Sequence, residues 1–385
     1  MKTVAVILGT RPEAIKLAPL IRELRAHRDA LQTEVVFSGQ HLHLVRPILE
    51  FFQIEVQRSL DLMQPDQTLA ALTARAMSAF SAVFAELQPA VIVVQGDTTT
   101  AMCAALAAFY QKISVAHLEA GLRTNARYSP FPEEINRRII SQIAGLHWAP
   151  TARAAEALRR ENLPLLPGRV VVTGNTGIDA LFDGLARIRA LPPDDADCQR
   201  ASDHRRSHPE AAIVLITGHR RENFGEPFRQ FCDAIKETAA RYPEALFIYP
   251  VHPNPNVREP VSRFLAALPN VLLTEPKNYP AFLRLLDLSD IILTDSGGVQ
   301  EEAPALGKPV LVTRFHTERP EGIATGHVTL IGPERTAILE HLGRLLDRHR
   351  AGQRGLPPAF PYGDGHAAPR CVASLLDREV AEFAG

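Results

Sequence analysis

The chain of 385 residues is 46% hydrophobic and 22% charged, ordinary values for a globular protein that exclude a largely disordered chain. Lys and Arg total 42 and Asp and Glu total 43, so the formal net charge is −1. Bulk charge therefore gives no reason to expect binding to nucleic acid or to an anionic membrane, because both require a basic surplus. The four cysteines form no CxxC pair, which is typical of reduced thiols in a cytoplasmic protein.

Short apolar segments rich in β-branched residues recur along the chain and predict strands. Segments with helical periodicity separate these strands, as in residues 14–24. The periodicity of residues 67–87 predicts a helix that faces the core, and a helix at a dimer interface is the alternative. Alternation of strand and helix predicts an α/β fold with parallel sheets covered by helices. In chain order the predicted strands are residues 3–8, 35–37, 91–94, 113–116, 170–173, 213–216, 246–249, 271–273, 291–293 and 310–312.

One segment breaks this alternation. Residues 189–210 are rich in Pro, Asp, Arg, Ser and His and have no apolar period, so they predict a linker. The domains expected on either side are residues 1–188 and 211–367, and a helical segment closes the chain after an irregular stretch rich in Pro and Gly.

Polar clusters, most of them with glycine, follow nearly every predicted strand. Ligands of parallel α/β sheets bind at the carboxyl ends of the strands, so clusters in both halves predict a ligand held between two domains. The clusters are Gly9–Glu13, Gly39–His41, Gly96–Thr99, His117–Gly121, Gly174–Gly177, Gly218–Glu222, Val251–Asn254, Asp295–Gly298 and Thr317–Pro320.

Two of these clusters suit an anion. The turn Asp295–Gly298 precedes a helix, whose first N–H groups favour a phosphate, although a simple N-cap explains the same residues equally well. Glu302, one turn further on, could contact a sugar hydroxyl or only complement the helix dipole. Arg11 and Lys16 could meet an anion from one side of their helix.

Three acids, Asp97, Glu119 and Glu133, are candidate catalysts at strand ends or loops of the first half. Carboxylates held close together raise one another's pKa, so that one can carry a proton near neutral pH. Each taken alone is more often a cap or a solvated charge. His219, beside Arg220, could donate a proton or a hydrogen bond to a diphosphate, although a lone histidine is more often structural.

Several cofactor and enzyme classes have no support in the sequence. The chain has no GxGxxG after a strand and no GxxxxGK[ST], so neither a dinucleotide nor a loop-bound NTP is expected. It has no HExxH motif and no GxSxG elbow of a serine hydrolase. The residues therefore predict neither a bound metal nor a dinucleotide cofactor.

The motifs, taken together, resemble the non-hydrolysing UDP-N-acetylglucosamine 2-epimerases. Ten of them occur in order and span almost the whole chain, and glycosyltransferases of the same wider fold lack HLEAGLRT and TERPE together. The motifs are GTRPEAIKLAPL at 9–20, GQH at 39–41, QGDTTT at 95–100, HLEAGLRT at 117–124, PEEINR at 132–137, GNTGID at 174–179, TGHRREN at 217–223, DSGGVQEEAPALGKPVL at 295–311, TERPEG at 317–322 and PYGDG at 361–365.

This resemblance implies two Rossmann-like domains facing across a cleft (the GT-B type), with the last helix, residues 368–385, crossing back to the first domain. It implies a homodimer that inverts carbon 2 of UDP-N-acetylglucosamine to give UDP-N-acetylmannosamine for surface polysaccharide synthesis. The implied route is elimination of UDP to a glycal-type intermediate, followed by re-addition. No metal or nicotinamide takes part.

The resemblance also implies a role for each candidate residue. Asp97, Glu119 and Glu133 would manage the carbon 2 proton, and His219 would assist departure of the diphosphate. The remaining positions would bind substrate: Arg11 and Lys16 from the first domain, Phe282 near the uracil, Ser296, Gly297 and Gly298 at the diphosphate, Glu302 at the ribose, and Arg319 at a further anionic group.

Some positions depart from the family pattern. His43 and Asp66 replace residues that bind a second, regulatory UDP-N-acetylglucosamine in regulated members, and an aspartate there would repel a phosphate. Lys277 and the Phe315-His316 pair also differ, which leaves a uronic acid or diacetamido UDP-sugar as an alternative substrate. A glycosyltransferase, a hydrolysing epimerase and a non-catalytic sensor of nucleotide sugars are competing hypotheses for the function.

Overall fold

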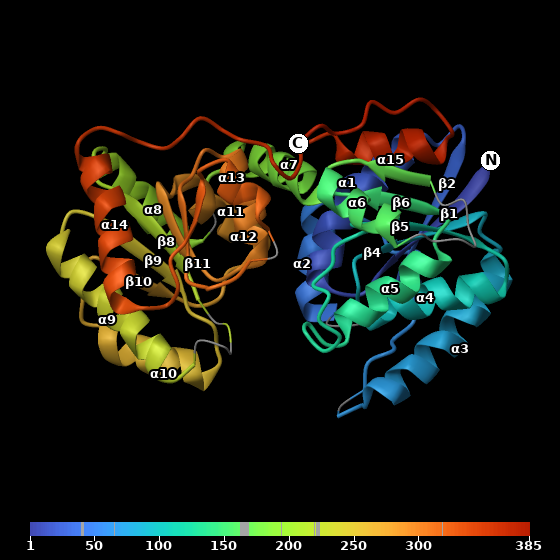
Figure 1. Ribbon diagram of the computed structural model, residues 1–385, viewed down its shortest axis with the longest axis horizontal. Coiled ribbons are helices and arrows are strands. Elements are labelled where there is room, and N and C mark those ends of the chain that lie inside the picture. Colours follow the sequence, from blue (N-terminus) through green and yellow to red (C-terminus); the bar gives the residue numbers. More distant parts are fainter. Residues whose placement is uncertain are drawn as a thin grey trace. The chain divides into compact units, whose positions relative to one another are not determined.

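The computed structural model describes residues 1–39, 42–64, 66–161, 169–193, 195–218, 220, 224–317 and 319–385. The chain forms two compact units, each built around its own parallel sheet (Figure 1). The first unit contains Met1–Asp183 and Tyr362–Gly385, and the second contains Gly184–Pro361. The α/β class predicted from the alternating pattern is confirmed.

The first unit has a seven-stranded sheet in the order β3-β2-β1-β4-β5-β6-β7, with every pair parallel. The central strands are mostly apolar and buried because helices cover both faces of the sheet. Their bounds are β1 (Lys2–Leu8), β2 (Leu31–Phe37), β3 (Arg58–Ser59), β4 (Val91–Gln95), β5 (Ser114–Leu118), β6 (Leu146–Ala149) and β7 (Arg169–Val172).

Helices α3 (Leu69–Leu87), α4 (Thr99–Tyr110) and α5 (Glu133–Ile143) cover one face of this sheet. Among the described helices, α3 alone is long and apolar enough to span a membrane by length and composition, a test that core helices also pass. It packs Phe80 and Phe84 into the core against β1 and β4, as predicted for a core-facing helix. The other helices of this unit are α1 (Arg11–Ala26), α2 (Leu42–Phe51), α6 (Ala152–Arg160), the start of α7 (Thr176–Arg189) and α15 (Ala367–Leu375).

The end of the chain packs in the first unit, where α15 lies against α1 (Figure 1). The indole N–H of Trp148 in β6 donates to the Ser374 hydroxyl at 2.7 Å. The Asp179 carboxylate in α7 accepts the backbone N–H groups of Ala367 and Ala368, which satisfies donors at the start of α15. The final helix is shorter than the predicted 368–385.

The second unit has a six-stranded parallel sheet in the order β10-β9-β8-β11-β12-β13. Its strands are β8 (Ile213–Thr217), β9 (Leu246–Pro250), β10 (Val271–Thr274), β11 (Ile291–Thr294), β12 (Val310–Val312) and β13 (Val328–Leu330). Its helices are α8 (Ala196–Ser207), α9 (Glu226–Arg241), α10 (Pro255–Leu265), α11 (Tyr279–Leu288), α12 (Gly297–Ala305), α13 (Glu321–Ala324) and α14 (Arg335–Arg350).

Residues 189–210, which the sequence predicts to be a linker, contain helix α8 and belong to the second unit. The helix buries only Cys198 and Ala201, so it has no apolar stripe to be seen in the sequence. Polar contacts hold it: Asp195 caps its first turn, and the Lys277 ammonium pairs with Asp195 at 2.8 Å and Asp197 at 2.6 Å. Lys277, which differs from the residue usual in the family pattern, thus has a structural role within this unit.

Two buried histidines lie side by side in the first sheet. His117 in β5 and His147 in β6 are register partners, and both are fully buried. Burial lowers the pKa of His117 to about 3 and that of His147 to about 4. Both imidazoles are therefore neutral in the folded protein, whereas unfolded histidine takes up a proton below pH 6.5.

This difference predicts a loss of stability in acid. Because the unfolded state binds more protons, the free energy of unfolding falls as the pH drops from about 6.5 towards 4, by up to about 3 kcal/mol for His147 alone. Replacing His147 by Leu should remove this contribution to the pH dependence of the free energy of unfolding. That free energy is measured at each pH by urea unfolding, followed by the fluorescence of Trp148, the single tryptophan. His366→Leu, at a side chain that is 71% exposed, is the control and should keep the wild-type slope.

Candidate functional site

The carboxyl ends of β4 and β5 are neighbours in the first sheet, where Gln95 is the register partner of Leu118. The residue after β5, Glu119, has a left-handed backbone with φ of +64°. Its carboxylate accepts hydrogen bonds from the Gln95 side chain and from the Lys16 ammonium of α1, and it is 9% exposed. Glu119 is thus held by one neutral and one cationic donor.

The turn after β4 places Asp97 beside this pair. Gly96 takes a φ of +67°, which glycine adopts without strain, and its carbonyl lies 2.7 Å from Nε2 of His117. The side chain of Asn136 in α5 donates to the Asp97 carbonyl at 3.0 Å. The Asp97 backbone is therefore fixed by the strand on one side and by α5 on the other.

Asp97 interacts electrostatically with both other candidate acids. Burial raises its pKa to about 6, and the charges of Glu119 and Glu133 add to that rise, while Arg137 and Lys16 oppose it. The Arg137 guanidinium lies 2.6 Å from the Asp97 carboxylate. One carboxylate oxygen of Glu133 is buried and has no hydrogen-bond partner among the described residues. The structure thus brings the three predicted acids together with Lys16.

The first turn of α1 contains a second buried carboxylate that the sequence indicated only as a helix start. Glu13 is 1% exposed and accepts the backbone N–H groups of Gly9 and Thr10, so Arg11 begins a helix with a complete capping box. Its other oxygen accepts the Thr98 hydroxyl at 2.8 Å. Burial raises the pKa of Glu13. Glu13 thus joins the start of α1, where Arg11 lies, to the turn that carries Asp97.

In the second unit, α12 begins where the predicted anion site falls. Ser296 is its N-cap residue, but the Ser296 side chain makes no capping hydrogen bond, so capping does not account for this hydroxyl. Gly298 is exposed, and a Cβ there would meet nothing within 4 Å. A Cβ on Gly297 would lie 2.8 Å from the Arg319 guanidinium carbon. A helix N-terminus that the Ser296 side chain does not cap and a guanidinium are thus adjacent, which suits a phosphate.

The other candidate residues of the second unit lie on α11, on α12 and in the loop that precedes α13. The Arg319 Nε donates to the buried Glu301 at 2.6 Å, and Glu302 follows half-buried in the second turn of α12. Phe282 is half-buried in α11, which follows β10 at the outer end of the strand order. Asp295 accepts the backbone N–H of Arg220 at 2.8 Å. The predicted catalytic residue His219 lies outside the described residues.

Sequence reasoning missed the ionic partners of α5. Arg137 and Glu134 are buried in the structure. In the sequence, however, charged residues near one end of an amphipathic helix are typical of a face exposed to solvent. The helical spacing of three residues was the available signal for this pair. Within the described part of the chain, no group of three or more His, Cys, Asp or Glu side chains could hold a metal ion.

Two parallel α/β units, a cluster of acids at the strand ends of one, and a phosphate-suited helix start in the other define an enzyme class that handles nucleotide-linked substrates. The family model described as UDP-N-acetylglucosamine 2-epimerase matches residues 22–376. The chain therefore belongs to the UDP-N-acetylglucosamine 2-epimerase family.

Individual relatives agree along almost the full length. The chain is 44% identical to the UDP-N-acetylglucosamine 2-epimerase of Yersinia pestis, over 98% of this chain and 99% of the relative. It is 42% identical to the enzyme of Escherichia coli K12, with the same coverage. Among solved structures, the Neisseria meningitidis UDP-GlcNAc 2-epimerase bound to UDP-GlcNAc has a TM-score of 0.85 and 42% identity, over 98% of this chain and 100% of that one.

The close packing of the turn after Glu119 predicts how a substitution at Gly121 changes the stability of the protein. Gly121 has a φ of +92°, and a Cβ there would lie 2.2 Å from the Ala154 carbonyl oxygen of α6. Gly121→Ala should lower the free energy of unfolding by about 2–5 kcal/mol, from backbone strain and overpacking together. Gly145→Ala is the matched control, because nothing lies within 4 Å of its added Cβ. Equal unfolding midpoints of the two variants in urea would contradict this account of the turn.

Proposed function

We propose that this chain interconverts UDP-N-acetylglucosamine and UDP-N-acetylmannosamine by inverting carbon 2. The observation that carries the proposal is the grouping of Glu119, Glu133 and Lys16 around Asp97, a carboxyl group whose pKa burial raises to about 6. The Neisseria meningitidis relative bound to UDP-GlcNAc supports the same substrate class. No cofactor is required, since the carbon 2 proton and the UDP group are exchanged without net oxidation.

The chemistry follows from the groups present. A carboxylate removes the carbon 2 proton, the bond between carbon 1 and the UDP oxygen breaks, and UDP leaves with the bonding electrons to give a glycal-type intermediate. Re-addition of UDP with a proton delivered to the opposite face of carbon 2 completes the inversion. Asp97, with a pKa of about 6, can take up and return a proton near neutral pH.

The remaining residues have binding roles in this proposal. Ser296, Gly297, Gly298 and Arg319 would hold the diphosphate, because expelled UDP carries its charge there. Glu302 would contact the ribose and Phe282 the uracil, while Arg11 and Lys16 would bind substrate from the first unit. His219 would assist departure of UDP.

One position that suggested a modified sugar, Lys277, has a structural explanation. Its ammonium pairs with Asp195 and Asp197, as described above, while Phe315 is 64% exposed. We therefore propose the unmodified substrate. We also propose a cytoplasmic homodimer whose product feeds surface polysaccharide synthesis.

Solvent exchange at carbon 2 tests the reaction. With UDP-N-acetylglucosamine in heavy water, proton NMR should show loss of the carbon 2 proton signal and appearance of the second epimer. Asp97→Asn and Glu119→Gln should each slow exchange by about 100-fold or more while UDP still binds, because a group that transfers the proton is lost. Glu156→Gln, at an exposed side chain of α6, is the control.

The outcomes distinguish the competing functions. UDP accumulating in step with turnover would indicate a hydrolysing epimerase, and turnover only with an acceptor and without exchange would indicate a glycosyltransferase. Binding without any turnover would indicate a sensor. Exchange within a few-fold of wild type in both Asp97→Asn and Glu119→Gln would refute the assignment of these two residues.

The pH dependence of exchange gives a second test. Asp97 must lose its proton before it can act as the base, and its pKa is raised to about 6 by burial. The exchange rate at saturating substrate should therefore be half-maximal near pH 6 and fall about tenfold per unit below it. Circular dichroism at each pH verifies that the enzyme stays folded. A rate that is constant down to pH 4.5 would exclude Asp97 as this base.

A further inference from the structure

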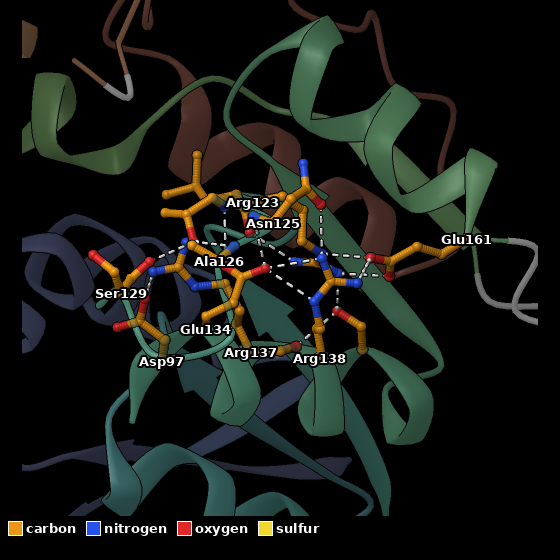
Figure 2. Close-up of polar contacts among 12 residues, drawn as sticks. Asp97, Arg123, Asn125, Ala126, Ser129, Glu134, Arg137, Arg138 and Glu161 are labelled. Atoms are coloured by element: carbon orange, nitrogen blue, oxygen red, sulfur yellow. Dashed lines mark hydrogen bonds and ion pairs between the residues drawn. The ribbon is translucent and has the colours of Figure 1, made fainter. Parts of the chain in front are cut away.

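A chain of alternating charges leads from Asp97 along one end of α5 (Figure 2). Asp97 pairs with Arg137, Arg137 lies 3.7 Å from Glu134, and Glu134 accepts from Arg138 at 2.9 Å. Arg138 in turn pairs with Glu161 at 2.8 Å, and Glu161 pairs with Arg123. We call these six residues the α5 ion-pair chain; of its members, only Asp97 is among the candidate acids.

Backbone hydrogen bonds hold Glu134 of the α5 ion-pair chain in place. It is 1% exposed and accepts the backbone N–H of Thr124 at 3.0 Å and that of Asn125 at 3.2 Å. Burial alone would raise its pKa, but the hydrogen bonds from Thr124 and Arg138 outweigh burial and lower it. Glu134 therefore stays ionised and presents a permanent negative charge to Arg137.

Arg123 and Glu161, at the far end of the α5 ion-pair chain, are also held in place. The Arg123 side chain is 5% exposed and donates through Nε and Nη2 to the two oxygens of Glu161, at 2.7 and 2.8 Å. A two-point contact of this kind fixes the orientation of both groups. Arg138 is thus positioned between two anchored carboxylates, and it cannot readily replace Arg137 at Asp97.

Arg137 is the cation in contact with Asp97. The charged groups facing Asp97 are Arg137 and Glu133 of α5, Glu119 after β5, and Lys16 of α1. The Lys16 ammonium bonds to Glu119. The Arg137 side chain, 8% exposed, places Nη2 on Asp97 and Nη1 towards Glu134, so the two carboxylates share one guanidinium.

We infer that Arg137 is a positioning residue, anchored by Glu134, that holds Asp97 in the orientation and charge state required for proton transfer at carbon 2. The inference rests on the proposed function. Without Arg137, the Asp97 carboxylate would face Glu119 and Glu133 with no cation in contact, and it would keep its proton to higher pH. Arg137 acts through Asp97 and needs no contact with the sugar.

The test compares pH profiles of carbon 2 exchange for three variants. Arg137→Gln should shift the acidic limb to higher pH by about 1–3 units, the effect of an adjacent opposite charge. Arg137→Lys keeps the charge and should return the limb to within about half a unit of wild type, with a lower maximal rate because a flexible ammonium lacks the rigid planar fork that fixes the orientation of Asp97. Arg138→Gln, the neighbouring residue, should lower the unfolding midpoint and leave the limb in place.

A limb that stays at the wild-type pH in Arg137→Gln, with the rate reduced by the same factor throughout, would overturn the inference. If Arg137→Gln does not fold, Arg137→Lys provides the test. The titration of the Asp97 carboxyl group is then followed by ¹³C NMR, and its signal is assigned by comparison with Asp97→Asn. Titration less than half a unit from wild type, with a reduced exchange rate, supports the inference, and a larger displacement overturns it. If the wild-type enzyme shows no exchange, the proposed function fails, and the ¹³C titration still tests the contact between Arg137 and Asp97.

Discussion

The first unit depends on keeping three like-charged side chains close together. Asp97, Glu119 and Glu133 repel one another, and burial strengthens that repulsion because less water screens it. A fold that brings them together must supply opposite charge and fixed backbone at the same place. Lys16 and Arg137 supply the charge, each at a different carboxylate, and this division leaves Asp97 with its pKa of about 6 and Glu119 paired.

The backbone around these acids shows the same constraint. Glu119 takes a left-handed conformation that costs a non-glycine residue of the order of 1 kcal/mol or more, and it is held between the strand end and the packed turn at Gly121. Glu13 links the neighbouring loop to Thr98. Because each acid is attached to a different element, a small shift of α5 would change the spacing between the acids, and a shift of α1 would move Lys16 away from Glu119. We infer that the buried polar contacts of α1 and α5 serve to hold that spacing.

The sequence predicted the parts of this arrangement that have a local signature. Strands with apolar runs and polar clusters at their carboxyl ends placed Asp97 and Glu119 at one edge of one sheet, and parallel pairing made them neighbours. Helix α8 had no such signature, because it is held by Lys277 from another part of the chain and not by an apolar stripe. The same reason hid Arg137 and Glu134, whose partners are set by tertiary contacts. A buried histidine such as His147 also has no signal in the sequence, since nothing there distinguishes it from an exposed one.

The net charge of −1 therefore describes a balance between local charges of opposite kind. In the first unit the candidate site carries more carboxylates than cations, which suits the handling of a proton. In the second unit the described part of the candidate site presents a helix N-terminus and Arg319, which suits a diphosphate. The proposed reaction releases UDP from one carbon and a proton from the next, and these two events require groups of both kinds. Each site also holds its own counter-charges, Lys16 beside Glu119 in the first unit and Glu301 beside Arg319 in the second, which offset part of the local charge.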